Sequence, residues 1–321
     1  MDSIYKPEGT RIGTQENREH LASPAALERA MNNGAIVEGI VTLCDSQLRL
    51  HVDLGCALGI IEPEDALFCR EGETRKDIAL ISRVGKPVAV RILSMENRGD
   101  QLIVRLSRRL AQQSCIRYYL SARKPGDIIP AKVTHMEPFG AFVDIGCGVS
   151  SLLSVDCISV SRISHPRDRL KCGEDLSVVV KSIDRESGRI YVSLREMLGT
   201  WEENAILFEA GQTVTGIIRS VESYGVFIEL TPNLAGLAEV KESVLEEMRH
   251  KIGHSAAVYI KSIVPDRMKI KLILINVCDP AAPARDLTYY IDAESTPHIT
   301  HWRYSPQGAR KTVETHFDEV V

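Results

Sequence analysis

Short apolar stretches with a period of two fill most of the chain between positions 34 and 277, and Gly, Asp and Pro interrupt them. Several of these stretches are rich in β-branched residues, as in Ile190-Tyr-Val-Ser-Leu194. Alternation in short runs of this kind predicts half-buried β-strands. The pattern becomes helical after Ser23-Pro24, from Ser107 to Ala122, and after Thr200, where Glu203 completes a capping box. The chain is therefore predicted to be all-β with a few short helices.

The strand pattern repeats three times along the chain. A glycine at 34, 126 and 211 opens each copy, and alternating apolar residues, a central strand with an acidic residue and a small loop follow it. Later parts of the copies agree as well, because Lys181-Ser-Ile183 of the second copy returns as Lys261-Ser-Ile263 in the third. Each copy has about 70 residues and room for five strands, the size of a small OB-type barrel. We expect three tandem five-stranded OB-fold barrels joined by short helical linkers.

The breaks in the pattern divide the chain into seven parts. An N-terminal arm with a short helix is expected at 1–33, and an irregular tail at 278–321. The barrels are expected at 34–109, 126–197 and 211–277, with helical linkers at 110–125 and 198–210. Trp201 in the second linker and the ring-rich tail segment 298–304 are each expected to pack against the barrels, although either could instead stack on nucleic-acid bases.

A pair of aromatic residues recurs in the second and third copies. Phe139 and Phe142 flank Gly140-Ala141, and Tyr224 and Phe227 flank Gly225-Val226. On a flat strand, side chains at i and i+3 point to opposite faces, so a glycine bend is needed to bring both rings together. Two rings on one surface would form a platform on which bases stack. The first copy has Gln47 to His51 at this place, with neither an aromatic ring nor a glycine.

The alternative for these rings is a place in the barrel core. Val143 and Ile145 already supply alternating inward positions beside Phe142, and the rings recur as pairs. Both observations favour exposed rings.

The charge of the chain limits how it could hold nucleic acid. Its 321 residues carry a formal net charge of −4 and a pI near 6.2, which argues against bulk electrostatic attraction. Six cations without an acidic residue lie between 105 and 124, as either a solvated helix face or a phosphate-contacting stripe. Lys132 and Arg219 lie at polar positions of their copies' first strands, where they could contact phosphates, and the basic loop 162–171 is expected to flank the RNA groove.

Signatures of catalysis, export and metal binding are missing from the sequence. It contains no Gly-x-Ser-x-Gly, no phosphate-binding glycine loop and no His-Glu-x-x-His, so we expect no enzyme and no small-molecule substrate. The eight cysteines form no Cys-x-x-Cys pair, so we expect no metal site and no cofactor. Scattered thiols, together with the lack of an apolar signal core or membrane-length apolar run, predict a cytoplasmic protein without membrane association.

The second copy resembles the S1 RNA-binding domain family. The matching marks are Gly126-Asp-Ile128, Pro138-Phe-Gly-Ala-Phe-Val-Asp-Ile-Gly146, Gly173-Glu-Asp-Leu176, Val180-Lys-Ser-Ile-Asp184 and Gly188-Arg-Ile-Tyr-Val-Ser193. The resemblance spans roughly residues 34 to 277, and it is strong in copy two, good in copy three and weak in copy one. The array as a whole resembles the shorter ribosomal S1 proteins of Gram-positive bacteria.

This resemblance implies a set of RNA-binding residues. They are Phe139, Phe142, Asp184 and Arg189 in the second copy, and Tyr224, Phe227 and Lys269 in the third. The third copy departs from the family because Val264 stands where the second copy has Asp184. The family's frequent histidine after the Gly-Leu-Val turn is also missing, since Ser154, Glu239 and Glu62 occupy that position in copies two, three and one.

The resemblance implies a protein that binds single-stranded RNA, mRNA above all, and holds it at the small ribosomal subunit during translation. The first copy, with an acidic segment from 62 to 81, is then expected to contact the subunit. Two alternatives stay open. The chain could present RNA to an RNA-decay complex, or it could be a protein-interaction scaffold.

Overall fold

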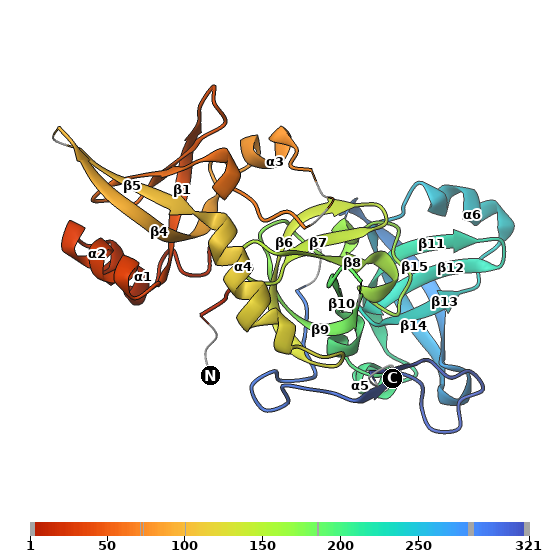
Figure 1. The fold of residues 1–321 in the computed structure, drawn as a ribbon. Helices are drawn as coiled ribbons and strands as arrows, with labels where there is room; N and C mark the ends of the chain where they lie inside the picture. The colour runs from red at the N-terminus through yellow and green to blue at the C-terminus, as the bar shows by residue number, and fades with distance from the viewer. Residues whose placement is uncertain are drawn as a thin grey trace. The chain divides into compact units, whose positions relative to one another are not determined.

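The computed structural model describes residues 4–70, 72, 74–99, 101–184, 186–281 and 286–317. Its dominant feature is three closed five-stranded barrels, which follow one another along the chain (Figure 1). This confirms the predicted all-β architecture of tandem OB-type barrels with few helices.

The barrels share one strand order. The first contains β1 (Ile36–Cys44), β2 (Leu50–Asp53), β3 (Leu58–Ile61), β4 (Pro87–Arg98) and β5 (Gln101–Ser107). The second contains β6 (Ile128–Glu137), β7 (Gly140–Asp144), β8 (Ser150–Ser154), β9 (Asp175–Ile183) and β10 (Ile190–Ser193). The third contains β11 (Thr213–Glu222), β12 (Gly225–Thr231), β13 (Leu234–Ala238), β14 (His254–Val264) and β15 (Lys269–Ala281). In each barrel a parallel pairing of the third and fifth strands closes the sheet, and the fourth and fifth strands pair antiparallel.

Short helices lie before, within and between the barrels. They are α1 (Gln15–Leu21), α2 (Pro24–Asn32), α3 (Asp77–Ile81), α4 (Arg108–Tyr118), α5 (Trp201–Ala205) and α6 (Glu242–Arg249). Single 3₁₀ turns occur at Pro63–Asp65, Leu120–Ala122, Val155–Cys157, Pro166–Asp168, Arg195–Leu198 and Pro265–Arg267. Within the described residues, no helix combines the length and apolarity that crossing a bilayer requires.

Contacts divide the chain into two compact units. The first comprises Met1–Arg123, Pro130–Lys132 and Asp144–Ser151, and the second comprises Lys124–Ile129, Val133–Val143 and Leu152–Val321. In each barrel the inward positions of the strands are fully buried aliphatic side chains, such as Val37 and Leu50 in the first and Val258 in the third. The period of two in the sequence therefore becomes a packed interior, which is what holds each barrel closed.

In the first unit, the N-terminal arm is fastened to the first barrel. The Asn17 side chain accepts a bond from the Glu38 amide and donates one to the Glu38 carbonyl, both at 2.9 Å. The carboxylate of Glu38 in turn accepts bonds from the amides of Gly9 (3.1 Å) and Arg11 (2.9 Å). Side-chain and backbone groups of one strand thus fix the arm on both sides of α1.

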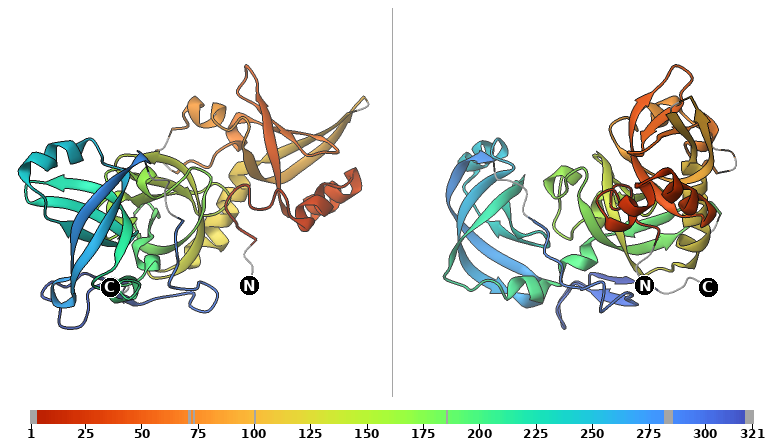
Figure 2. Two further views of the ribbon diagram at one scale, coloured as in Figure 1. Left: turned by 180° about the vertical axis from the view of Figure 1, so that it is seen from behind. Right: turned by 90° about the vertical axis from the view of Figure 1, so that its left-hand side faces the viewer.

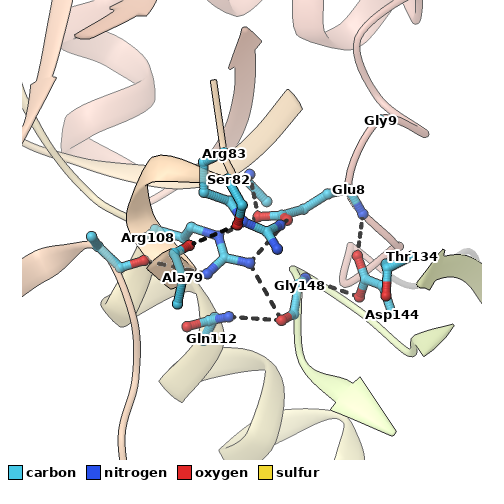
Figure 3. Close-up of polar contacts among 12 residues, drawn as sticks. Glu8, Gly9, Ala79, Ser82, Arg83, Arg108, Gln112, Thr134, Asp144 and Gly148 are labelled. Atoms are coloured by element: carbon cyan, nitrogen blue, oxygen red, sulfur yellow. Dashed lines mark hydrogen bonds and ion pairs between the residues drawn. The ribbon is translucent and has the colours of Figure 1, made fainter. Parts of the chain in front are cut away.

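A buried ion pair joins the arm to α4 (Figure 3). The Arg108 guanidinium donates to both oxygens of Glu8, from Nε at 2.6 Å and from Nη2 at 2.9 Å. The Glu8 amide donates to Asp144 Oδ2 at 2.7 Å, and Asp144 Oδ1 accepts from the Gly148 amide at 2.9 Å. Burial, with the negative charge of Glu8 adding to it, raises the pKa of Asp144 to about 7. This network is structural, because its carboxylates and guanidinium are enclosed.

The arginines of the basic stretch from 105 to 124 make side-chain contacts within the first unit. Besides Arg108, two of its arginines pair with carboxylates: Arg105 with Glu62 at 3.3 Å and Arg109 with Asp65 at 3.0 Å. Two more lie over tyrosine rings, Arg117 over Tyr118 and Arg123 over Tyr119. Of the two interpretations that the sequence left open, these contacts favour a solvated helix face over a phosphate-contacting stripe.

In the second unit, the tail folds back beside α5, as Figures 1 and 2 both show. The capping box at Thr200 and Glu203 is present, with bonds of 2.7 and 3.2 Å. Trp201 is buried, and its amide donates to the Tyr304 carbonyl at 3.0 Å. Trp302, Tyr304 and Phe317 of the tail are buried as well. These rings are therefore packing residues and not a second stacking surface.

Candidate nucleic-acid interface

The two phenylalanines of the second barrel lie together at the start of β7. Phe139, in the turn between β6 and β7, is 56% exposed, and Phe142 on β7 is half-buried. Their ring centroids are 6.0 Å apart and their planes are perpendicular at 89°. Gly140 makes this approach feasible, because a Cβ there would lie 2.6 Å from the Leu153 carbonyl oxygen. The two rings at i and i+3 thus meet, as the sequence predicted, and Gly140 leaves room for the neighbouring strand beside them.

The third barrel repeats this geometry with different rings. Tyr224 is 61% exposed, and Phe227 on β12 is half-buried. Their centroids are 6.1 Å apart at 87°. Gly225 has a φ of +151°, and a Cβ there would lie 2.6 Å from the Ala238 carbonyl oxygen. The repeat in sequence is therefore also a repeat in space, down to the angle between the rings.

A third ring in the second barrel was missed by the sequence analysis. The imidazole of His135, exposed on β6, is stacked on Phe142 with centroids 6.3 Å apart at 22°, and its Nε2 lies 2.6 Å from the Glu137 carboxylate. In the third barrel, Ser220 is the residue that pairs with Phe227 across β11 and β12. The available signal was the outward position of His135 on a strand of period two, which alone does not reveal its cross-strand neighbour.

The polar pair implied by the family resemblance, Asp184 and Arg189, lies on a different turn from the aromatic rings. Asp184 follows β9, and its carboxylate accepts bonds from the amides of Glu186 (2.9 Å) and Ser187 (3.1 Å). These amide bonds hold the pKa of Asp184 below its ordinary value, so the group is a carboxylate that shapes the turn. Arg189 is exposed at the end of the same turn. Lys269 has the matching place in the third barrel, paired with Val264 where β14 meets β15, and is exposed.

Arg219 is engaged elsewhere than on the ring surface. Its side chain is 9% exposed, and its Nε donates to the Glu229 carboxylate. Its Nη2 donates to the Asp168 carbonyl at 3.0 Å, and its Nη1 lies 3.4 Å from the Asp168 carboxylate. Arg169 pairs with the same Glu229 at 2.6 Å and is buried. The expectation that Arg169 flanks an RNA groove is therefore wrong, and Arg219 belongs to this buried cluster between loop 162–171 and β12.

The remaining predicted contact, Lys132, lies on β6 between the buried residues Ala131 and Val133. Its side chain is half-buried. An amphipathic lysine at such a position can keep its ammonium group at the surface.

At the turn where the other two barrels carry an aromatic pair, the first barrel carries charged residues. The carboxylate of Asp45, at the turn after β1, accepts a bond from Arg49 Nε at 2.8 Å and lies 3.2 Å from His51 Nε2. Leu48 in this turn has a φ of +61°. This turn therefore carries a closed ion pair where the other two barrels carry two rings.

Comparison with known proteins finds a family match on the second barrel. A family model described as the S1 RNA binding domain matches residues 123–195. The chain is 28% identical over 195 residues to small ribosomal subunit protein bS1 of Leuconostoc lactis, covering 58% of this chain and 45% of that one. It is 30% identical over 163 residues to bS1 of Staphylococcus aureus strain COL, covering 49% and 41%. The chain thus spans less than half the length of these relatives.

Among solved structures, the chain is similar to GSP13 from Bacillus subtilis, with 26% identity and a TM-score of 0.22 over 23% of this chain and 56% of that chain. A TM-score this low adds nothing to the description of the fold. Residues 123–195 thus match the S1 RNA binding domain model, and about half of the chain is similar to the small ribosomal subunit protein bS1 of Gram-positive bacteria.

Proposed function

We propose that this chain binds single-stranded RNA on the ring pairs of its second and third barrels, without catalysing a reaction. The observation that carries the proposal is the near-identity of the two pairs, at 6.0 Å and 89° against 6.1 Å and 87°, with an exposed outer ring in each. A core position has no need for an exposed ring, whereas stacking on a base requires one.

Energetics favour stacking as the main source of affinity. Each base stacked on a protein ring contributes roughly 1–3 kcal/mol and tolerates any base identity. The exposed cations Arg189 and Lys269, at the turns between the last two strands of their barrels, add phosphate contacts, and Lys132 is a further candidate. Two barrels on one chain multiply their affinities through effective concentration. We therefore infer a preference for unpaired, flexible RNA of mixed sequence.

A double variant tests this surface. Phe139→Ala with Phe142→Ala should weaken the binding of an unstructured RNA at least about tenfold, on the stacking scale above, with the barrel still folded. Fluorescence anisotropy gives the affinity and circular dichroism the fold. Tyr118→Ala is the matched control, because Tyr118 on α4 is 64% exposed but lies outside both ring pairs. Unchanged affinity in a folded double variant rejects the surface.

At the level of the cell, we infer that this chain is a cytoplasmic protein that holds mRNA at the small ribosomal subunit, the particle for which its bS1 relatives are named. The first barrel is the candidate for contact with the subunit, because it has no ring pair and because Ile78, Ile81 and Val84 expose apolar side chains on and just after α3. Acidic residues of the segment from 62 to 81 are in part paired with arginines, and Glu71 and Glu73 lie outside the described residues.

Co-sedimentation with small subunits tests this role. The full chain should co-sediment, and Ile78→Asp with Ile81→Asp should reduce the bound fraction several-fold without changing RNA affinity. Gln101→Asp, on the same barrel at an exposed position, is the control. A chain that binds RNA but never co-sediments would favour RNA presentation to another complex, and one that co-sediments without binding RNA would favour a scaffold.

A further inference from the structure

The tail ends in a two-stranded ribbon with an unusual face. β16 (His301–Arg303) and β17 (Glu314–His316) are antiparallel, and His301 pairs directly with His316. Because side chains alternate along a strand, His301, Glu314 and His316 share one face, and Trp302 lies on the other, buried. The side chains of His301, Glu314 and His316 are all exposed.

The donor atoms on this face lie close enough together to share one ion. Glu314 Oε2 lies 3.3 Å from His301 Nε2, and Glu314 Oε1 lies 3.4 Å from His316 Nε2. One ligand atom from each of the three residues lies within 4.8 Å of the others. Bonds of about 2.0–2.1 Å to a tetrahedral zinc ion place neighbouring donor atoms about 3.3–3.4 Å apart. Across the described part of the chain, this is the one group of three such side chains close enough to share an ion.

We propose that His301, Glu314 and His316 bind a divalent transition-metal ion, zinc in the first place. Imidazole nitrogen and one carboxylate oxygen are a donor set suited to zinc and its neighbours, whereas calcium and magnesium take oxygen ligands. Three protein ligands leave the fourth position to water.

The ribbon holds these ligands in place before any ion binds. On its opposite face, Thr315 Oγ1 donates to the Glu196 carboxylate at 2.9 Å and accepts from Arg195 Nη2 at 3.0 Å. Backbone bonds from Tyr304 N to Val313 O and from Phe317 N to Thr300 O, both 2.9 Å, flank the two strands. Ligands on a pre-formed ribbon lose little conformational freedom on binding.

The two imidazoles are already close, with centroids 4.4 Å apart at 28°. Arg303 lies opposite Glu314 on the same face, and its positive charge disfavours the binding of a metal cation there. We therefore expect micromolar affinity, weaker than that of four-ligand structural zinc sites.

Cobalt titration of the full, tag-free and chelator-stripped chain tests the site. Co²⁺ should bind at one equivalent with the intense visible bands of tetrahedral coordination, and Zn²⁺ should displace it. His301→Ala, His316→Ala and Glu314→Gln should each weaken binding at least about tenfold. His20→Ala is the control, because His20 has one carboxylate neighbour, Glu16 at 4.0 Å.

Two further readouts make the result decisive. The thiols of Cys56, Cys172 and Cys278 are exposed, and cobalt bound to them would give near-ultraviolet thiolate charge-transfer bands. Zn²⁺ should also slow amide hydrogen exchange in residues 300–317 of the parent chain but not of the folded His316→Ala variant. Absence of binding, binding with thiolate bands, or binding that survives all three ligand variants overturns the site.

Discussion

Within each ring motif, the residues divide the work between RNA and the fold. The outer rings, Phe139 and Tyr224, are exposed, whereas the carboxylates of the same motifs, Asp144 and Glu229, are buried. Asp144 accepts a hydrogen bond from the amide of Glu8, and Glu229 forms an ion pair with Arg169. Membership in the ring motif therefore does not by itself indicate that a residue contacts RNA, because some motif residues bind other protein groups instead.

The ring of Tyr224, and not its hydroxyl, should matter for binding. Tyr224→Ala should cost roughly 1–3 kcal/mol of RNA-binding free energy, because a stacked ring is lost, whereas Tyr224→Phe should stay within about twofold of the parent. Anisotropy titrations of the two variants with the same RNA measure this difference. Equal losses in both variants would mean that the hydroxyl binds RNA and that stacking is not the interaction.

The buried carboxyl of Glu38 should make the stability of the arm on the first barrel depend on pH. Burial raises the pKa of Glu38 from 4.5 to about 7, with the charge of Glu8 adding to it and bonds from the amides of Arg11 and Gly9 opposing it. The folded pKa lies above the unfolded one, so this stabilisation is complete below about pH 4.5 and is lost as pH rises to about 7. We expect a loss on the order of 2 kcal/mol between pH 5 and 8.

Thermal unfolding between pH 5 and 8 measures that loss. Glu38→Gln should reduce the pH dependence of the midpoint, although it lowers stability overall because an amide cannot accept every bond that Glu38 accepts. Some dependence should persist, since Asp144 shifts in the same direction. Glu19→Gln, at an exposed position, is the control. A pH profile identical in Glu38→Gln and the parent would contradict this account.

At the level of elements, the loop before β9 supports the third barrel instead of an RNA groove. Arg169 from the loop and Arg219 from β11 converge on Glu229 of β12, and all three are nearly buried. A second contact joins the same region, where the Asn233 side chain accepts from the Val160 amide at 2.9 Å. Loop and strands thus form one packed junction.

Removing the shared carboxylate should damage this junction. Glu229→Ala leaves two buried guanidinium groups short of their counter-charge, which costs about 3–5 kcal/mol. Glu246→Ala removes an exposed pair with Arg249 instead and should cost less than about 1 kcal/mol. Chemical denaturation of both variants measures the two losses. Similar small losses would show that the buried cluster is dispensable.

Local patterns in the sequence were enough to predict the three barrels and the contact between the paired rings. Period-two strands predicted the three barrels, and the glycine between the rings predicted that Phe139 and Phe142 meet, because both features depend on neighbours along the chain. The pairing of Arg219 with Glu229, and of Arg108 with Glu8 far away in sequence, needs tertiary contacts that one sequence does not display.

The tail illustrates the same limit. His301 pairs with His316 only through the register of β16 and β17, and no short motif links them. The sequence therefore gave no reason to expect a metal site there. The stacking of His135 on Phe142 was missed for the same reason.

At the scale of the whole molecule, a net charge of −4, from 39 basic and 43 acidic residues, implies that affinity does not depend mainly on phosphates. With about three phosphate contacts on single-stranded RNA, the logarithm of affinity should fall with the logarithm of salt at a slope near −2. Titrations at several salt concentrations give this slope. A slope steeper than about −4 would mean that a basic surface, and not the rings, dominates binding.

The most direct test of the account follows the rings themselves. In a chain with isotope-labelled Phe and Tyr, NMR spectra recorded during titration with unstructured RNA report each ring. Base stacking predicts upfield ring-current shifts for Phe139 and Tyr224, contacts between their ring protons and base protons, and unchanged signals for Tyr118. RNA that binds while the signals of all four paired rings stay unchanged would contradict the central claim.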